Sequence, residues 1–399
     1  MNTNAITSAA KNIGLAKTTA IRFVILIGIV SLFADMTYEG ARSITGQYLA
    51  VLGATGLVVG IVAGLGELIG YTLRLVSGYF SDRTHRYWTF TIVGYAVNLI
   101  AVPLLALAGS WEIAAVLLIL ERTGKAIRTP ARDAMLSYAT EQTGRGWGFG
   151  LHEAMDQIGA VLGPLIVAVV LALRGTYQSA FALLLIPALL ALTTLIVARV
   201  LYPNPRDLEI NTPKLQTQGF PRVFWIYLIA VGLVGAGYVD FPLISFHFQQ
   251  AQIAPDAWIP ILYAIAMATD AIAALVFGRL FDRMGIGILI VVTLLSAFFA
   301  PLVFLDGFGL AVVGMMLWGI GLGAQESILR AAVAGMTVPE RRGSAYGIFN
   351  TGFGVMWFLG SVLMGYLYDV SLPALIALSV LLQLAAIPFF LAVRGQKQS

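Results

Sequence analysis

The chain contains no cysteine, only three histidines and few charged residues. Without cysteine it forms neither a disulfide nor a thiolate metal site, and the histidines at positions 85, 152 and 247 are scattered. Charged residues make up 11% of the chain and apolar residues 59%, whereas soluble domains contain about 25% charged residues. A soluble protein of this length cannot hide so much apolar surface in its core. The composition therefore places the chain in a lipid bilayer.

The sequence also lacks the motifs of enzymes and of nucleotide-driven pumps. It has no phosphate-binding loop, no cluster of metal ligands and no nucleophile motif. The glycines within residues 64–66 and 319–323 lie in apolar segments with no strand before them, so they fail the context of a dinucleotide-binding loop and suit helix packing. We predict no enzyme activity, no cofactor and no metal site. Energy must then come from an ion or solute gradient.

Twelve apolar segments are long enough to cross the membrane, since a helical span needs about 20 residues. They are predicted at residues 22–48, 56–81, 88–108, 111–139, 146–173, 176–201, 222–249, 257–281, 286–305, 309–337, 342–368 and 372–394. The polar residues 1–19 resemble the start of a signal peptide, but Asp35 and Glu39 in the next segment indicate a retained span. The sequence thus predicts an all-α integral membrane protein.

The stretch from Tyr202 to Phe220 is the only long polar connector, and it lies at the middle of the chain. We predict an amino-terminal tail (1–21), a six-helix bundle (22–201), a linker (202–221), a second six-helix bundle (222–394) and a short tail (395–399). Nearly all lysines and arginines outside the spans fall on one side of this topology, and only Arg174 falls on the other. Positive loops face the cytoplasm, so both termini and the linker are predicted there.

The same pattern bears on location and partners. We expect a multi-pass protein of a bacterial-type inner membrane that works as a monomer and meets lipid, protons and a small-molecule substrate. The net charge of +4 and the pI of about 9.2 reflect cytoplasmic loops and not nucleic-acid binding.

A short motif indicates that the chain contains an internal repeat of one helical unit. The motif G-x-x-x-D-R ends the second span as Gly78, Asp82 and Arg83, and ends the eighth span 200 residues later as Gly278, Asp282 and Arg283. The fifth and eleventh spans begin with Arg-Gly pairs at 145–146 and 342–343. Internal repeats of this kind are typical of secondary transporters.

Together these features resemble the major facilitator superfamily over nearly the whole chain. The resemblance implies two pseudo-symmetric six-helix bundles that rock about a cavity lined by spans 1, 2, 4, 5, 7, 8, 10 and 11. It implies that G-x-x-x-D-R is a cytoplasmic latch, in which Asp82 binds Arg132 and the start of span eleven. In a simpler alternative, Arg83 and Arg86 hold the loop inside by charge alone.

Two further segments resemble motifs of this superfamily. The run from Gly159 to Pro164 in span five is similar to the antiporter motif of its efflux branches, although the further glycines of that motif are absent. The segment from Arg122 to Asp133 occupies the place of the superfamily's arginine motif in span four, and it is more cationic.

Ionisable residues in the first half fall on single helical faces. The faces comprise Asp35, Glu39 and Arg42 in span one, Glu67 and Arg74 in span two, Glu121, Lys125, Arg128 and Arg132 in span four, and His152 and Asp156 in span five. Buried charges usually face the interior of a bundle, so these faces predict a polar cavity. The spacings of Glu39 with Arg42, Glu121 with Lys125 and Glu326 with Arg330 also allow ion pairs within one helix.

The second half carries fewer charges. They are Asp240, Asp270, Glu326 and Arg330, while Gln325 and Asn350 stand where the repeat places Arg128 and Glu153 in the first half. We infer that the first half handles protons and the charge of the substrate. The second half then offers shape and aromatic contacts, from Tyr238, Phe241, Trp318, Phe353 and Trp357.

The predicted proton carriers are Asp35, Glu39, Asp156, Asp240 and Asp270. Asp35 leads, because it lies near mid-membrane with no cation one turn before it, and a desolvated carboxylate can load and release a proton. The predicted substrate-cavity residues are Arg42, Glu67, Arg74, Arg122, Lys125, Arg128, His152, Glu153, Gln325, Glu326, Asn350 and Trp357. Lys125 and Arg128 share one face and suit a carboxylate or phosphate, while the many acidic residues leave a cationic or zwitterionic substrate open.

These patterns indicate a secondary transporter of a small organic solute that works by alternating access. Proton-coupled efflux of a drug or metabolite is the leading interpretation, on the partial antiporter motif. Proton-coupled uptake of an organic anion or metal chelate is the alternative, on the cations of span four. A third interpretation is a membrane receptor or scaffold that transports nothing. The predicted polar lining formed by four spans argues against this interpretation.

The predicted topology can be tested with reporter fusions. We expect green fluorescent protein fused to the carboxyl terminus to fluoresce in bacterial cells, and alkaline phosphatase fused after Arg174 to be active, because the basic loops hold the other side in the cytoplasm. An active phosphatase at the carboxyl terminus contradicts the topology.

Overall fold

In a computed structural model, the described residues 3–143, 145–204, 219–305, 307–337 and 342–396 form helices joined by short turns, without a strand. The helices are α1 (Thr3–Val51), α2 (Gly56–Thr84), α3 (Tyr87–Leu104), the 3-10 helix η1 (Leu105–Leu107), α4 (Trp111–Thr143), α5 (Arg145–Ala172), α6 (Tyr177–Leu183), α7 (Leu185–Leu201), α8 (Arg222–Gly237), α9 (Phe241–Gln250), α10 (Trp258–Met284), α11 (Gly287–Ser296), α12 (Phe299–Phe304), α13 (Phe308–Ala334), α14 (Arg342–Val370) and α15 (Leu372–Gln396). The predicted linker and carboxyl-terminal tail lie largely outside the described residues.

A bilayer offers no water to backbone N–H and C=O groups, so helices that satisfy these groups internally are the expected spanning elements. Among the described residues, eleven helical segments are long and apolar enough to span a membrane. The 33-residue α4 is long enough to be the twelfth, and its many charged residues set it apart. The prediction of an all-helical membrane protein is confirmed.

Several spans are interrupted, which the apolar pattern did not reveal. The predicted seventh span consists of α8 and α9, separated by residues 238–240. Asp240 caps α9 by accepting a hydrogen bond from the Phe241 backbone N–H at 2.8 Å, and Pro242 follows in the first turn, where proline is tolerated. The sixth and ninth spans divide into α6 and α7 and into α11 and α12. The first helix starts earlier than predicted, at Thr3.

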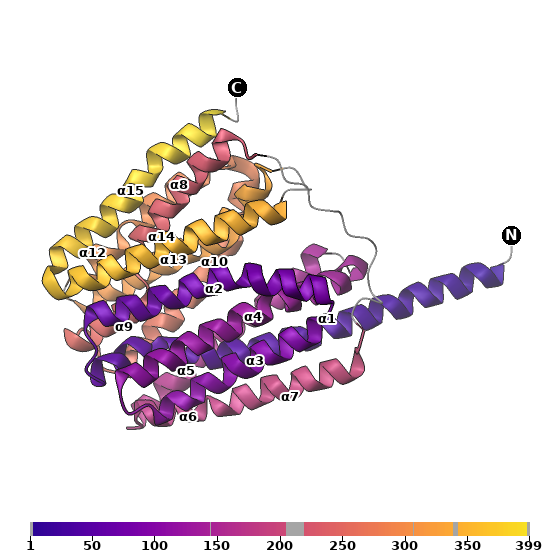
Figure 1. The fold of residues 1–399 in the computed structure, drawn as a ribbon, viewed down its shortest axis with the longest axis horizontal. Helices are drawn as coiled ribbons and strands as arrows, with labels where there is room; N and C mark the ends of the chain where they lie inside the picture. Colours follow the sequence, from indigo (N-terminus) through magenta and orange to yellow (C-terminus); the bar gives the residue numbers. More distant parts are fainter. Residues whose placement is uncertain (1–2, 144, 205–218, 306, 338–341, 397–399) are drawn as a thin grey trace.

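The helices of the two halves lie against each other (Figure 1). In the first half α1 packs on α4, α5 and α7, and in the second α8 packs on α14 and α15. Gly163 lets α5 approach α1, since a Cβ there would lie 2.3 Å from the Met36 carbonyl oxygen. Gly360, 197 residues later, does the same for α14 on α8, where a Cβ would lie 2.2 Å from the Ala236 carbonyl oxygen. The sequence repeat is therefore a repeat of helix packing.

The halves meet mainly along three helix pairs, α2 with α14, α1 with α9, and α5 with α10. One end of this interface is closed tightly. A Cβ at Gly46 would fall 1.9 Å from the Pro242 carbonyl oxygen. At the same end, the Asp369 carboxylate of α14 accepts hydrogen bonds from the backbone N–H groups of Gly56 and Leu57 at 2.9 and 2.8 Å. It thereby binds the amino-terminal end of α2, where the helix dipole favours an anion.

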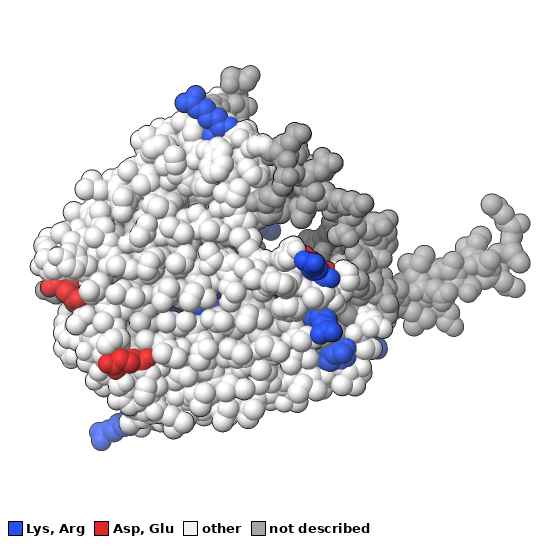
Figure 2. Space-filling view, viewed as in Figure 1, with Lys and Arg blue, Asp and Glu red and all other residues white. Residues whose placement is uncertain are grey.

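Charged side chains are unevenly placed on the outer surface. In the view of Figure 2, basic side chains lie at the right, at the top and at the lower left, and acidic side chains lie mainly at the left. Most of the visible surface between these groups carries no charge, as expected for a surface that faces lipid.

The glycine contacts predict a contrast between two matched substitutions on α5. We expect Gly163→Ala to destabilise the protein by about 1–3 kcal/mol through overpacking, because its methyl group meets the backbone of α1. We expect Gly150→Ala to be neutral or stabilising, because that position faces open space and alanine favours a helix. Thermal unfolding in detergent measures both, and equal melting temperatures contradict the packing role of Gly163.

Candidate functional site

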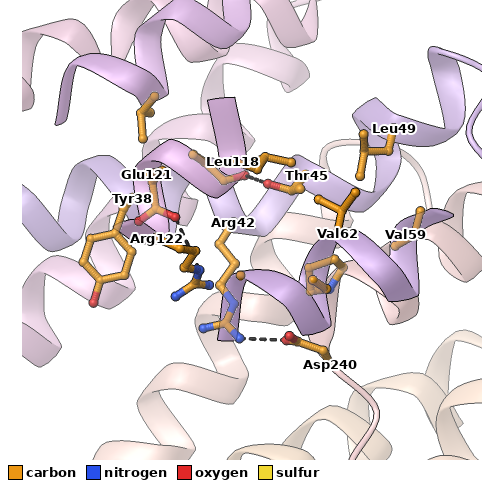
Figure 3. Close-up of a pocket in the computed structure, with 15 residues that line it drawn as sticks. Tyr38, Arg42, Thr45, Leu49, Val59, Val62, Leu118, Glu121, Arg122 and Asp240 are labelled. Carbon is orange, nitrogen blue, oxygen red and sulfur yellow. Dashed lines mark hydrogen bonds and ion pairs between the residues drawn. The ribbon is translucent and has the colours of Figure 1, made fainter. Parts of the chain in front are cut away.

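An ion-pair network joins the two halves near the closed end. Arg42 of α1 lies 2.7 Å from Asp240 at the start of α9 and 3.6 Å from Glu67 of α2. Arg122 of α4 lies 3.4 Å from Glu67 and 3.3 Å from Glu121. Figure 3 shows Arg42 and Asp240 pointing toward each other. Each of these side chains is at most 15% exposed, and each is paired, as charges buried in a membrane protein generally are.

A small cavity borders this network. Its apolar wall includes Leu49, Val59, Val62 and Leu118, and its polar wall includes Tyr38, Arg42, Glu121, Arg122 and Asp240 (Figure 3). The Glu121 carboxylate also accepts a hydrogen bond from the Asn98 amide at 2.7 Å. Each charged group on the wall belongs to an ion pair of the network, and Arg42 Nε has no hydrogen-bond partner among the described residues.

Two predicted proton carriers on α1 accept hydrogen bonds from tyrosines. The Tyr38 hydroxyl donates to Asp35 Oδ2 at 3.0 Å, and the Tyr263 hydroxyl of α10 donates to Glu39 across the interface. Asp35 is 4% exposed. The ion pairs considered within one helix are not those that form: Arg42 pairs with Asp240 and Glu67, and Glu121 pairs with Arg122. The Arg330 side chain lies outside the described residues, so its pairing with Glu326 stays a prediction.

Lys125 and Arg128 of α4 lie near the rings of Tyr38 and Tyr95, and we term these four residues the cationic niche. Lys125 Nζ lies 3.7 Å from the centroid of the Tyr38 ring, and the Arg128 guanidinium carbon lies 4.1 Å from that of Tyr95. Arg128 is 1% exposed, and its Nε and Nη1 have no hydrogen-bond partner among the described residues. Buried N–H groups normally have acceptors, so the Arg128 guanidinium retains donor capacity that the described residues do not use.

Polar residues of α5 lie close to Asp35, since α5 packs on α1 and a Cβ at Gly159 would lie 3.1 Å from Asp35 Cβ. The His152 ring lies 2.9 Å from Ser31 Oγ, and one turn later Asp156 has a buried Oδ1 without a partner among the described residues. Gln157 reaches across the interface and donates to Asp270 Oδ2 of α10 at 3.3 Å. Asp270 is buried, and its Oδ1 is also unpartnered in the described part of the chain. Three predicted carboxylates, at 35, 156 and 270, therefore lie along one polar region between the halves.

The second half completes this region with uncharged polar groups. Both amide atoms of Gln325, the Oδ1 of Asn350 and the Nε1 of Trp357 are buried and without hydrogen-bond partners among the described residues. Trp357 packs on Tyr238, at 5.6 Å between ring centroids, within a larger aromatic cluster. Glu153 and Glu326 are exposed, and Arg74 is half-buried beside the ring of Tyr71. The second half thus presents mainly amide and aromatic groups.

The latch residues lie at the end opposite the closed one. Asp82, Arg83, Asp282 and Arg283 are exposed at the ends of α2 and α10, and the Tyr87 hydroxyl donates to Asp82 at 3.3 Å. Gly78 is in ordinary contact with Pro130, while a Cβ at Gly278 would meet nothing within 4 Å. The predicted partner Arg132 instead lies 2.8 Å from Asp133 and donates to Ser31 at 3.2 Å. Residues 338–341, which precede span eleven, lie outside the described residues.

Sequence reasoning missed five polar residues that organise the site: Tyr38, Tyr95, Asn98, Gln157 and Tyr263. Uncharged side chains in an apolar span give little signal, although Tyr38 stands three residues after Asp35 and Gln157 follows Asp156 directly. Asp369 had a clearer signal. Residues 365–369 repeat the G-x-x-x-D pattern at the far end of span eleven.

A protein-family model described as Major Facilitator Superfamily matches residues 24–329 and 241–399. An uncharacterized protein of Mycobacterium tuberculosis is 43% identical over 383 residues, covering 94% of each chain. An uncharacterized MFS-type transporter of Methanocaldococcus jannaschii is 30% identical, covering 87% of this chain and 89% of its own.

Solved structures share the fold at low sequence identity. The crystal structure of the nucleoside transporter NupG has a TM-score of 0.72 at 15% identity, covering 94% of this chain and 99% of its own. An auto-inhibited peptide transporter of the POT family has a TM-score of 0.70 at 13% identity, covering 94% of this chain and 97% of its own.

The network predicts that the cross-interface ion pair holds one end closed. We expect Asp240→Asn to loosen this end while keeping the helix cap, since asparagine also caps helices but leaves Arg42 without its closest carboxylate. A cysteine placed at Thr45, in this chain without natural cysteines, should then react about tenfold faster with an impermeant maleimide, the effect of about 1.4 kcal/mol. Asp133→Asn, which breaks a pair within α4, serves as the control and should leave the rate unchanged. Equal rates in both variants contradict the gating role.

Proposed function

The chain belongs to the major facilitator superfamily, and from this premise we propose that it is a secondary transporter that carries a small organic anion together with protons. The fold and the relatives make it a multi-pass membrane transporter of small molecules. The nature of the substrate and the coupling ion follow from the site and are our proposal.

The observation that carries this proposal is the cationic niche. Arg128 is buried with two nitrogen atoms unpartnered among the described residues, and Lys125 lies beside it over the Tyr38 ring. A guanidinium next to an ammonium suits a carboxylate or phosphate, which accepts several charge-assisted hydrogen bonds. The charged groups of the network contrast with this niche, because they already pair with one another.

Proton coupling follows from the charges around the niche. The charges of Lys125 and Arg128 interact with those of Asp35 and Asp156, and the four charges sum to zero when all four groups are ionised. A proton on Asp35 leaves one positive charge for an anion, and charges interact strongly in a weakly polar interior. Proton and anion then favour each other's binding by linkage, which favours their movement in the same direction. Asp156, Asp270, Asp240 and Glu39 remain proposed as secondary proton carriers.

Alternating access supplies the movement. We take residues 22–201 and 222–394 as the two rocking bundles of a monomer. The closed end, with Arg42 and Asp240, is assigned to the outside, because the basic loops mark the other end as cytoplasmic. At the cytoplasmic end, the G-x-x-x-D-R segments at 78–83 and 278–283 act as latches in the state in which that end is closed. Both termini face the cytoplasm of a bacterial-type inner membrane.

Proton-driven efflux is the second candidate function. It is supported by the partial antiporter motif, whose Gly159 and Gly163 place α5 directly against the backbone of α1, where Cβ atoms would lie 2.2 and 2.3 Å from carbonyl oxygens. This contact holds Asp156 close to Asp35 and would serve a proton antiporter as well as a symporter.

The proposal predicts how two substitutions alter transport in proteoliposomes. With radiolabelled phosphate, sulfate and small carboxylates as probes, an outside-acid gradient should drive uptake into right-side-out vesicles. Arg128→Gln should lower uptake about 10- to 100-fold, the effect of losing hydrogen bonds to a charged group. Asp35→Asn should remove the stimulation by the pH gradient. The exposed Arg174→Gln is the matched control and should behave like the natural chain.

Each outcome separates the candidates. Stimulation by an inside-acid and not an outside-acid gradient favours efflux. Transport that ignores both the gradient and Asp35→Asn rules out proton coupling through Asp35. Transport of uncharged solutes that ignores Arg128→Gln rules out the anionic substrate.

A further inference from the structure

We propose that Tyr38 is the positioning residue that couples proton binding at Asp35 to anion binding at the cationic niche. This inference rests on the proposed function. Tyr38 contacts both parts of the site: its hydroxyl donates to Asp35 Oδ2 at 3.0 Å, and the centroid of its ring lies 3.7 Å from Lys125 Nζ. The Arg128 guanidinium carbon lies 6.0 Å from the same ring.

The position of Tyr38 in the fold fixes both contacts. Residues 35 and 38 lie one turn apart on α1, so the hydroxyl reaches the carboxylate of its own helix. Lys125 belongs to α4, which packs against α1, and the ring face attracts its ammonium group. The side chain is 6% exposed, so neither contact is replaced by free water. A single buried residue therefore touches the proposed proton carrier and the proposed anion ligand.

Tyr38 carries one hydroxyl proton, and the state of Asp35 decides where it points. When Asp35 is ionised, it can only accept hydrogen bonds, and the Tyr38 hydroxyl donates its hydrogen bond to it. When Asp35 is protonated, it carries its own O–H donor and no longer requires that of Tyr38. The Tyr38 hydroxyl is then free to donate to an anion at Lys125 and Arg128. Protonation thus adds one donor to the niche at the same time as it removes one negative charge.

Other titratable groups surround this pair and must be separated from it in a test. They are Glu39, Arg42 and Tyr263 near the hydroxyl, Tyr95, Lys125, Arg128 and Arg132 on α3 and α4, His152 and Asp156 on α5, and Asp240 on α9. His152 is the group among them that ordinarily titrates between about pH 5 and 8. A His152→Gln variant therefore belongs in the experiment.

Sulfate is a suitable probe, because its charge does not change across this pH range. Its affinity for the purified full-length protein can be measured by calorimetry in detergent at about pH 5.5 and 8. We expect tighter binding at the acidic pH in the natural chain. In Tyr38→Phe, which keeps the ring beside Lys125, binding should weaken about tenfold at acidic pH and change little at alkaline pH, so the pH dependence flattens. Tyr38→Leu, which also removes the ring, should weaken binding at both pH values.

Tyr48→Phe is the matched control. Tyr48 is a buried tyrosine of α1 whose hydroxyl donates to the carbonyl oxygens of Leu105 and Ala108, at 3.0 and 2.7 Å, away from the niche. The sulfate affinity of the Tyr48→Phe variant should depend on pH as that of the natural chain does. Thermal unfolding of each variant confirms that the fold is intact.

The results distinguish this inference from the proposed function. If sulfate binds, Arg128→Gln abolishes binding and Tyr38→Phe keeps the full pH dependence, the role of Tyr38 is wrong and the anion niche stands. The role of Tyr38 is also wrong if only His152→Gln flattens the pH profile. If sulfate does not bind the natural chain, or binds Arg128→Gln equally, the proposed niche is wrong and the role of Tyr38 falls with it.

Discussion

A charge placed among membrane helices must find its counter-charge inside the protein, and this constraint organises the structure. The pair of Arg42 and Asp240 meets it across the two halves, at 2.7 Å, so neutralising the charges also holds the halves together at one end. The same constraint makes Arg128 informative. The Arg128 residue is 1% exposed, and two of its guanidinium nitrogen atoms have no partner among the described residues, against one in Arg42. One set of buried charges thus joins the two halves, and the other is the set to which we assign the substrate.

Most of the architecture could be predicted from the sequence, because a bilayer leaves few choices. Apolar length sets the spans, basic loops suggest the orientation, and the repeated motifs relate the halves. The glycines at 163 and 360 show why the repeat can be recognised in the sequence. Close helix contacts leave no room for a side chain at either position. The break before Asp240 was not predictable in this way, because an apolar stretch looks the same whether its helix is continuous or interrupted.

The burial of several candidate residues was predictable, but their pairing was not. Helical periodicity placed Asp35, Lys125 and Arg128 on inward faces, and the structure brings their helices together. Periodicity relates residues within one helix, whereas Arg42 finds its closest carboxylate 198 residues away. Uncharged residues such as Tyr38 carry no periodic signal at all. The solved transporters make the same point, because a fold shared at about 15% identity leaves the polar lining free to differ.

The contact of Asp369 with the start of α2 has a consequence for the energetics of opening. It joins a carboxylate to two backbone N–H groups at the rim of the protein, and water can hydrate both partners as soon as they separate. Such a contact costs little free energy to exchange for hydration. The two end states can therefore lie close in free energy. When the end states are close in free energy, the gradients across the membrane set the direction of net flux, and the protein itself does not.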